Sequence, residues 1–348
     1  MPFALTDLTA LATAPFDTII DVRSEAEYAE DHIPGAINLP VLNNEQRDIV
    51  GTIYVQDSRF KARKLGAALV ARNSAHHLET ALKDKDSKWR PLVYCWRGGQ
   101  RSSSFTTILR QVGWQAETID GGYKAYRRLV KTLLYDTPFS GRILLLDGNT
   151  GSAKTDILLR LPGLGVQIID LEGLAHHRGS LFGARPEGQP SQKAFESALA
   201  QKLIRLDTSR PVVIEAESAK IGNLIIPPAL WAAMRAAPRL EIRAPLQARA
   251  RYLTRAYGDI IEDSARLRDI LNKLRPYQPK ERIAHWLELA DAGHMQTLAA
   301  ELMSHHYDSR YSKARDRSDR ITPLATKGLA ARDLDKLARH IAELVASI

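Results

Sequence analysis

The single cysteine of the 348-residue chain, Cys95, lies in a stretch whose composition favours a reactive thiol. In this stretch, YCWRGGQRS (residues 94–102), the cysteine is followed by Arg97, Gly98, Gly99 and Arg101. The glycines let the backbone turn tightly, so several N–H groups can point into one concavity before a helix, and such a concavity binds anions and stabilises a thiolate. We expect the two arginine charges to favour the thiolate further. An isolated cysteine is more often an inert buried residue, but this setting indicates a nucleophile in an anion-binding loop.

A second candidate anion site follows the apolar run 144–146. The stretch DGNTGSAKT (residues 147–155) has the strand–loop–helix layout of a Walker A motif, with the loop glycines Gly148 and Gly151. In this motif Lys154 pairs with phosphate, and Thr155 stands where a magnesium ligand is found. The motif asks for glycine at position 153, where the chain has alanine; we expect the methyl group to be tolerated if Ala153 has helical φ, because the steric penalty falls on positive φ. The stretch therefore predicts a phosphate-binding loop with Mg²⁺ as a candidate ion.

Further polar side chains could complete the phosphate site. Glu215 and Glu217 end the apolar run 212–214, a Walker-B-like position from which a carboxylate can hold a metal or polarise water. A solvated strand end is an equally good interpretation of each glutamate. Arg178, in the polar segment HHRGS, is a candidate phosphate contact. No cysteine–histidine spacing indicates zinc, so the metal stays unassigned.

The C-terminal third is basic and carries interleaved tyrosines. Residues 249–282 contain nine Lys or Arg against five acids, and residues 305–315 form a second basic, aromatic stretch. Arginines can clamp phosphates and tyrosines can stack on unpaired bases, as in single-stranded RNA recognition, although charged helix faces are usually only solvated. The candidate RNA contacts are Arg266, Arg268, Lys273, Tyr307 and Tyr311.

The overall composition limits the classes of protein that need to be considered. One cysteine excludes an internal disulfide and fits a reducing compartment, so we expect a cytoplasmic protein. The first residues lack the basic segment of a signal peptide, and no apolar run approaches the ~20 residues of a membrane span. The net charge of +9 raises the prospect of a polyanionic partner.

The elements that would position these residues alternate between strands and helices in the first two thirds of the chain. Strands are predicted at 18–22, 91–94 and 115–119, and again at 142–146, 166–169, 212–214 and 240–242. Helices are predicted at 60–72, 102–112 and 123–135, and from residue 245 onward the pattern is nearly all helical. Strand–helix alternation predicts parallel sheets covered by helices, so the fold class is α/β.

The segment DTPFSG (residues 136–141) has the proline, serine and glycine of a linker between two such α/β parts. We therefore expect a first α/β domain at 1–136 and the core of a P-loop α/β domain at 137–245. The helical region at 246–348 is expected to pack on the P-loop domain and to bind RNA.

The first of these domains resembles a rhodanese. The runs DVR (21–23), EY (27–28) and HIPGAIN (32–38) match the rhodanese signature, and DGGY (120–123) falls where rhodaneses have a glycine pair. By this resemblance Cys95 would carry sulfur or selenium. Five residues separate Cys95 from Arg101, whereas most single-domain sulfurtransferases have four. Rhodanese-fold phosphatases also have five, so a phosphatase stays open, although no general acid is evident.

The order of a rhodanese, a P-loop domain and a basic helical end resembles the tRNA 2-selenouridine synthase family over nearly the whole chain. The supporting runs are HIPGAINLPVLNNEQR, GTIYVQDSRFKARKLGAALVAR, YCWRGGQRSSS, GNTGSAKT, HHRGSLFG and VVIEAESAKIGN. The resemblance implies a transferase that replaces the sulfur of 2-thiouridine at the wobble position U34 of tRNA with selenium. It implies S-geranylation with geranyl diphosphate and then selenation with selenophosphate, with an S-selanylcysteine intermediate on Cys95. Ala153 departs from this family's loop, which normally has glycine.

By the same resemblance the partners would be the tRNAs for Lys, Glu and Gln, with selenophosphate synthetase as a further candidate. No tightly bound cofactor, no membrane and a monomer are expected. Two other classes stay open. One is a rhodanese-fold phosphatase or sulfurtransferase fused to a P-loop kinase-like domain. The other is a non-catalytic RNA-binding protein that uses its P-loop as a nucleotide switch. Whether the P-loop takes ATP, GTP or geranyl diphosphate is not decided by the sequence.

Overall fold

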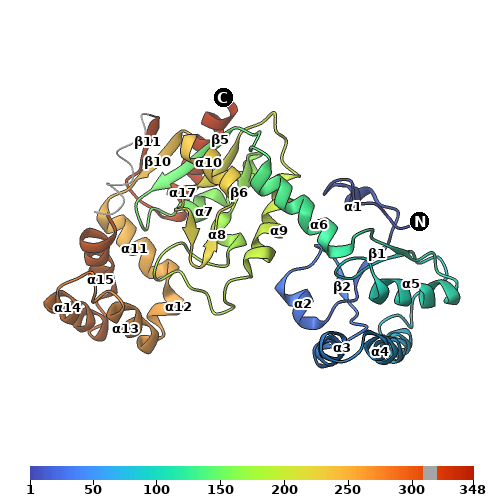
Figure 1. The fold of residues 1–348 in the computed structure, drawn as a ribbon. Coiled ribbons are helices and arrows are strands. Elements are labelled where there is room, and N and C mark those ends of the chain that lie inside the picture. The colour runs from blue at the N-terminus through green and yellow to red at the C-terminus, as the bar shows by residue number, and fades with distance from the viewer. Residues whose placement is uncertain (309–319) are drawn as a thin grey trace. The chain divides into compact units, whose positions relative to one another are not determined.

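The computed structural model describes residues 1–308 and 320–348, which form two compact units (Figure 1). The first unit comprises Met1–Thr137 together with Pro190–Arg205. The second comprises Pro138–Gln189 and Leu206–Ile348. The linker predicted at 136–141 thus coincides with the change from the first unit to the second.

A four-stranded parallel sheet forms the centre of the first unit, in the order β2-β1-β3-β4. Its strands are β1 (Thr18–Asp21), β2 (Ile37–Asn38), β3 (Pro91–Tyr94) and β4 (Glu117–Thr118). Its helices are α1 (Ala10–Thr13), α2 (Glu25–Glu30), α3 (Asn44–Gln56), α4 (Arg59–Glu79), α5 (Gln100–Val112) and α6 (Gly122–Lys131), the last continued by the π-turn η1 (Thr132–Asp136). The strands predicted near residues 18, 91 and 117 are confirmed, whereas the two-residue strand β2 was not predicted.

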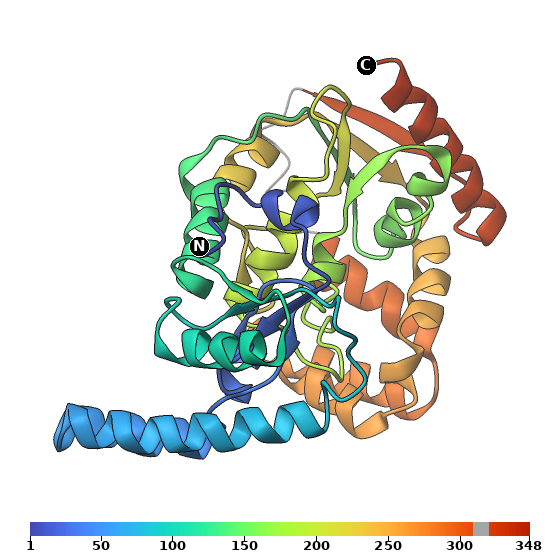
Figure 2. The ribbon, with the colours of Figure 1, turned by 90° about the vertical axis from the view of Figure 1, so that its right-hand side faces the viewer.

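Helices α3 and α4 form a hairpin in which the two helices lie side by side (Figure 2). Each helix begins at a side-chain cap: Asn43 accepts a hydrogen bond from the N–H of Gln46, and Ser58 accepts one from the N–H of Lys61. The helix predicted at 60–72 is therefore correct in kind but extends to Glu79.

One helix of the first unit comes from much later in the chain. Helix α9 (Gln192–Leu203) packs on α6 and η1. The buried carboxylate of Asp31 accepts hydrogen bonds from Tyr123 (2.6 Å) and from Ser197 of α9 (2.8 Å). Glu196 of α9 pairs with Arg127 and accepts a hydrogen bond from Tyr135. These buried polar contacts hold α9 in the first unit, although its neighbours in sequence belong to the second.

A five-stranded parallel sheet forms the centre of the second unit, in the order β11-β10-β5-β7-β6. Its strands are β5 (Ile143–Gly148), β6 (Gln167–Ile169), β7 (Val212–Glu215), β10 (Arg239–Arg243) and β11 (Ile321–Ala325). The accompanying elements are α7 (Lys154–Leu158), the 3₁₀ turn η2 (Leu161–Leu164), α8 (Leu171–Leu174), α10 (Pro228–Ala236), α17 (Ala331–Ala346) and the hairpin β8 (Lys220–Ile221) and β9 (Leu224–Ile225). Because the strands are parallel, the segments that follow β5, β6 and β7 meet at one edge of the sheet.

A helical part of the second unit follows β10. It contains α11 (Leu246–Ala256), α12 (Gly258–Ile261), α13 (Ser264–Asn272), α14 (Lys280–Asp291), α15 (Met295–Leu302) and the π-turn η3 (Met303–Tyr307). Its apolar core surrounds the fully buried Trp286. In the described part of the chain, no helix is both long and apolar enough to cross a membrane.

The expectation of an almost wholly helical C-terminal region is wrong at β11. This strand pairs with β10 at the edge of the P-loop sheet, and α17 packs on α7 and η2. Its sequence, ITPLA, contains Pro323, which argues against a central strand but is compatible with an edge strand that has one free side.

Candidate active site

Cys95 lies directly after β3 and before α5, as the sequence predicted. Its side chain is only 4% exposed, and its Sγ lies 3.2 Å from the hydroxyl of Ser102, which donates to it. The Sγ also lies 3.9 Å from the carbonyl oxygen of Gly99. The thiol is therefore held at the bottom of the loop that leads into α5.

The glycine pair at 121–122 shapes the floor of this loop. Gly122 has a φ of +57°, and a Cβ atom there would lie 2.3 Å from the carbonyl oxygen of Cys95. The same carbonyl accepts a hydrogen bond of 2.9 Å from the N–H of Tyr123, and the carbonyl of Trp96 accepts one from the N–H of Lys124 at 3.0 Å. A side chain at position 122 would push the start of α6 away from the cysteine loop.

The electrostatics of the loop favour the thiolate. Burial raises the pKa of the Cys95 thiol, but hydrogen bonds from the side chain and backbone of Ser102, the charge of Arg101 and the N–H of Arg97 outweigh it and lower the pKa below its usual value. The two arginines differ in their surroundings. Arg101 forms an ion pair of 2.6 Å with Glu27, whereas Arg97 is exposed at the surface of the loop.

Arg23, in the DVR run of the rhodanese signature, contacts the elements that carry the cysteine loop. Arg23 is 1% exposed and forms an ion pair of 2.6 Å with Asp21. It also donates to the carbonyl of Asp31 at 2.7 Å and stacks 4.1 Å from the centre of the Tyr123 ring. This buried pair is structural, because it fixes the elements on which the cysteine loop rests.

In the second unit, the phosphate loop connects β5 to α7. Lys154 folds over the loop and donates to the carbonyl of Gly148 at 3.0 Å. The hydroxyl of Thr155 donates to Glu172 at 2.8 Å. Gly148 and Gly151 have φ of +155° and +80°, so glycine is required at both positions. The loop lines a cavity of about 460 Å³.

Ala153 does not have the helical φ with which its methyl group was expected to be tolerated. Its φ is +60° and its ψ +30°, in the left-handed region, where a Cβ atom costs about 1 kcal/mol or more. The chain therefore keeps the loop conformation that glycine would adopt, at the cost of local backbone strain.

The two glutamates predicted beside the loop have different places. Glu215 is fully buried and accepts a hydrogen bond of 2.7 Å from the N–H of Glu172. Burial and the neighbouring carboxylates Asp170 and Glu172 raise its pKa well above the usual range. Glu217 lines the phosphate-loop cavity, where burial and the charge of Glu172 raise its pKa to about 8.

Glu172 also lines this cavity, although it was not predicted as a site residue. A signal was present, because the carboxylates of Asp170 and Glu172 follow the predicted strand at 166–169 at the same sheet edge. The hydroxyl of Thr155 and these carboxylates are oxygen donors that suit Mg²⁺. Among residues 1–308 and 320–348, however, no group of three or more His, Cys, Asp or Glu side chains could hold a metal ion by itself. The donor set thus fits Mg²⁺ only in part, and the ion stays a prediction.

Arg178 also lines the cavity, and its contact with phosphate stays a prediction. Its guanidinium lies 4.8 Å from the centre of the Tyr257 ring and donates to Asp259 at 3.0 Å. The ion pair and the ring orient the arginine at the wall of the cavity.

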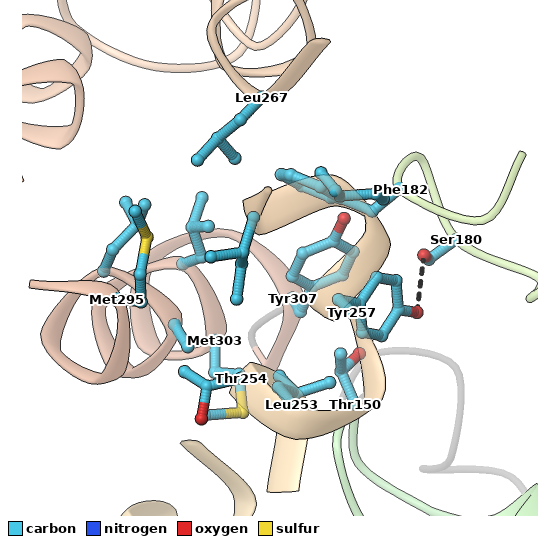
Figure 3. Close-up of a pocket in the computed structure, with 15 residues that line it drawn as sticks. Thr150, Ser180, Phe182, Leu253, Thr254, Tyr257, Leu267, Met295, Met303 and Tyr307 are labelled. Atoms are coloured by element: carbon cyan, nitrogen blue, oxygen red, sulfur yellow. Dashed lines mark hydrogen bonds between the residues drawn. The ribbon is translucent and has the colours of Figure 1, made fainter. Parts of the chain in front are cut away.

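The candidate RNA contacts differ in their surroundings. Arg268 pairs with Asp291, Arg266 lies 3.8 Å from Asp259, and Lys273 is exposed. Tyr307 lines a separate, apolar cavity of the second unit (Figure 3), which is a different setting from an exposed stacking platform. Tyr311 lies outside the described residues.

These two sites define a class of protein, a rhodanese-like domain joined to a P-loop domain. Comparison with known families agrees: residues 5–129 match the model of the rhodanese-like domain, and residues 141–288 match that of the tRNA 2-selenouridine synthase AAA domain. A tRNA 2-selenouridine synthase of Hahella chejuensis is 38% identical over 251 residues, and one of Nitrosomonas europaea is 37% identical over 248 residues. One of Psychromonas ingrahamii is 32% identical over 250 residues.

The chain belongs to the tRNA 2-selenouridine synthase family. The alignments cover 69%, 70% and 72% of this chain and 63%, 64% and 67% of the Hahella, Nitrosomonas and Psychromonas proteins, respectively. The chain thus spans a little less than two thirds of the first two relatives.

Proposed function

We propose that this chain converts 2-thiouridine at the wobble position of tRNA to 2-selenouridine. The observation that carries the proposal is the joint presence of a thiol with a lowered pKa in an anion-binding loop and of a phosphate loop, in a chain of this family. For the alkylation we propose a diphosphate donor, because diphosphate is a good leaving group, and for the selenation a phosphate-type selenium donor. Each donor matches one of the two loops.

In the first step, we propose that the P-loop holds geranyl diphosphate. The sulfur of 2-thiouridine attacks C1 of the geranyl group, the C1–O bond breaks, diphosphate leaves and the N3 proton of the base is lost. Lys154, which lines the phosphate-loop cavity, would neutralise the leaving diphosphate, and the loop N–H groups would bind its oxygens. A Mg²⁺ ion brought by the diphosphate would be held by Thr155 and would add charge neutralisation.

In the second step, Cys95 would take up selenium from selenophosphate. An S–Se bond forms, and the P–Se bond breaks with its electron pair left on phosphorus, which leaves as phosphite. The terminal selenium then bonds to C2 of the nucleoside and expels geranyl thiol. Because Cys95 is the chain's single cysteine, an external small-molecule thiol must reduce the S–Se bond to release 2-selenouridine, and a second thiol resolves the disulfide left on Cys95.

Two variants separate these steps. Cys95→Ser should abolish 2-selenouridine and accumulate S-geranyl-2-thiouridine, whereas Lys154→Ala should slow geranylation roughly tenfold to a hundredfold, the effect of losing about 1.5–3 kcal/mol. Nucleoside mass spectrometry of tRNA treated with each protein measures both products. Normal 2-selenouridine from Cys95→Ser would exclude the carrier role, and a parental geranyl transfer rate from Lys154→Ala would exclude the diphosphate role of the P-loop.

The phosphorus product tests the carrier route independently. Transfer through Cys95 releases phosphite, whereas direct attack by selenophosphate on C2 followed by hydrolysis releases phosphate. Phosphorus NMR distinguishes the two. Phosphate as the sole product would replace the carrier role of Cys95 with direct transfer.

A phosphatase is the second candidate, because the five residues between Cys95 and Arg101 match the loop length of rhodanese-fold phosphatases. Release of phosphate from an aryl phosphate by the parent protein but not by Cys95→Ser, without tRNA, would support it. The tRNA isoacceptors for Lys, Glu and Gln, a selenophosphate synthetase partner and a monomeric state stay predictions.

A further inference from the structure

An apolar cavity lies beside the phosphate loop in the second unit. It is partly open, has a volume of about 80 Å³ and is lined almost wholly by carbon atoms of the helical part, among them those of Leu253, Leu267 and Met295 (Figure 3) and of Ile260 and Leu298. One water molecule needs about 10–15 Å³ of such a volume, so there is room for roughly five to eight groups of the size of water or a methylene. The cavity is large enough for a short hydrocarbon chain.

This cavity and the phosphate-loop cavity share a wall. Thr150 of the phosphate loop, Ser180, Leu253 and Tyr257 line both. The hydroxyls of Ser180 and Tyr257 lie 3.4 Å apart on this shared side, and Met295 lies on the opposite side of the apolar cavity (Figure 3). A ligand with phosphates on the loop therefore has an apolar space directly beside it.

The shared wall is fixed to the phosphate loop. Arg249 of α11 donates to the carbonyl of Thr150 at 3.0 Å and pairs with Asp308 at 2.7 Å. A Cβ atom on Gly151 would lie 2.9 Å from Cγ of Leu253, so α11 rests on the loop backbone. The apolar space thus has a defined position relative to bound phosphate.

We propose that this cavity binds the hydrocarbon chain of a prenyl diphosphate whose phosphates lie on the P-loop, and that Met295 and Leu298 limit the length of the chain. This inference rests on the proposed geranyl transfer and adds the residues that select the donor. A nucleobase fits less well, because almost none of the exposed lining is polar although hydroxyl-bearing residues contribute to it, so the polar edge of a base would lack hydrogen-bond partners. Each methylene buried in the cavity should tighten binding about fourfold.

Small-to-large substitution at Ala299, a lining residue of α15, tests the proposal by filling the cavity. Calorimetry would measure the binding of geranyl diphosphate, inorganic diphosphate and ATP to the parent protein and to Ala299→Phe. We expect Ala299→Phe to weaken geranyl diphosphate at least tenfold and to change inorganic diphosphate less than twofold. Gln296→Phe, on an exposed position of the same helix, is the matched control and should change neither.

A second variant tests the chain-length limit in the opposite direction. Met295→Ala enlarges the far end of the cavity, so the affinity ratio of farnesyl to geranyl diphosphate should rise several-fold, while dimethylallyl diphosphate stays weak. This second variant keeps the proposal testable if Ala299→Phe misfolds. Thermal unfolding would show whether Ala299→Phe is folded. An unchanged farnesyl-to-geranyl ratio in Met295→Ala, or full geranyl diphosphate affinity in folded Ala299→Phe, would overturn the proposal.

Failure of the proposed function has a different signature. If Lys154→Ala binds inorganic and geranyl diphosphate as tightly as the parent does, the P-loop is not the diphosphate site, whatever the cavity variants show. If ATP binds more tightly than geranyl diphosphate and Ala299→Phe leaves both affinities unchanged, the cavity is only a gap in the helical core.

Discussion

The hydroxyl of Ser102 lies 3.2 Å from Sγ of Cys95 and 3.1 Å from the carbonyl oxygen of Gly99. A hydroxyl has one proton, so it can donate to only one of these acceptors at a time. Ionisation of the thiol makes Sγ the stronger acceptor, and the serine then donates to it. Ser102 is thus a positioning residue that stabilises the charged form of the nucleophile.

Ser102→Ala should raise the pKa of the Cys95 thiol and slow its reaction with iodoacetamide at neutral pH. Loss of a hydrogen bond to a charged group of about 1.5–3 kcal/mol corresponds to roughly one to two pH units in the midpoint of the rate profile. The measurement is the alkylation rate of Cys95 against pH. Ser103→Ala, an exposed neighbour on α5, serves as the control. Superimposable profiles for Ser102→Ala and the parent would remove this role from Ser102.

Ala153→Gly should stabilise the protein, because glycine adopts the φ of +60° at this position without a Cβ penalty. We expect the free energy of unfolding to rise by about 1 kcal/mol, less a part lost to the greater freedom of glycine in the unfolded chain. Urea denaturation measures the change. The same substitution at the exposed helical residue Ala232 of α10 should lower stability by up to about 1 kcal/mol. A loss of stability at both positions would show that Ala153 is not strained.

The strands that carry the two loops could be predicted from the sequence because they are continuous apolar runs. Pro91–Tyr94 and Ile143–Gly148 are buried along their whole length, and each ends at a glycine-containing loop. The short edge strand Ile37–Asn38 and the proline-containing strand Ile321–Ala325 lack this pattern. Their places are set by pairing with distant strands, which local periodicity does not report.

The same limit applies to the candidate site. The positions of Cys95 and Lys154 in strand–loop–helix segments could be predicted, because their loops have characteristic glycine and arginine or lysine spacing. The position of Glu172 after a predicted strand was visible in the sequence, but its proximity to Thr155 was not, because that depends on how β6 and β5 are ordered in the sheet. The left-handed conformation of Ala153 could not be predicted from the residue type, because alanine ordinarily avoids positive φ.

Glu217→Gln should change the pH dependence of stability. Burial and the charge of Glu172 raise the pKa of Glu217 from 4.5 to about 8, so between these values the folded protein keeps a proton that the unfolded chain releases. The free energy of unfolding of the parent therefore falls as the pH rises through this window. The glutamine cannot titrate, so this contribution to the fall is absent from the variant.

Urea denaturation at about pH 6 and about pH 8.5 tests this sign. The stability of Glu217→Gln relative to the parent should increase from the lower to the higher pH. Glu262→Gln, at an exposed position, should show no such trend. A difference between Glu217→Gln and the parent that stays constant with pH would mean that the Glu217 carboxyl titrates in its ordinary range.

Charge reversal in the helical part should test its proposed contact with tRNA. Each neutralised phosphate contributes about −0.7 to −0.9 to the slope of log affinity against log salt concentration. Reversal of Arg266, Arg268 and Lys273 together should therefore flatten the slope and weaken the binding of all tRNAs alike. Lys273 should contribute most, because it is exposed, whereas Arg268 and Arg266 lie beside Asp291 and Asp259. Filter binding across a salt series measures the slope.

The ion pair of Arg268 and Asp291 offers a matched control for this experiment. Arg268→Asp combined with Asp291→Arg keeps the net charge and can re-form the pair, so the slope should stay close to that of the parent. Such an exposed pair contributes only about 0.2–1 kcal/mol to stability, so the swap should leave the fold intact. The slope of log affinity against log salt concentration reports how many ions are displaced by bound tRNA. If the folded variant with Arg266, Arg268 and Lys273 all reversed keeps the parental slope, the tRNA contacts lie elsewhere on the chain.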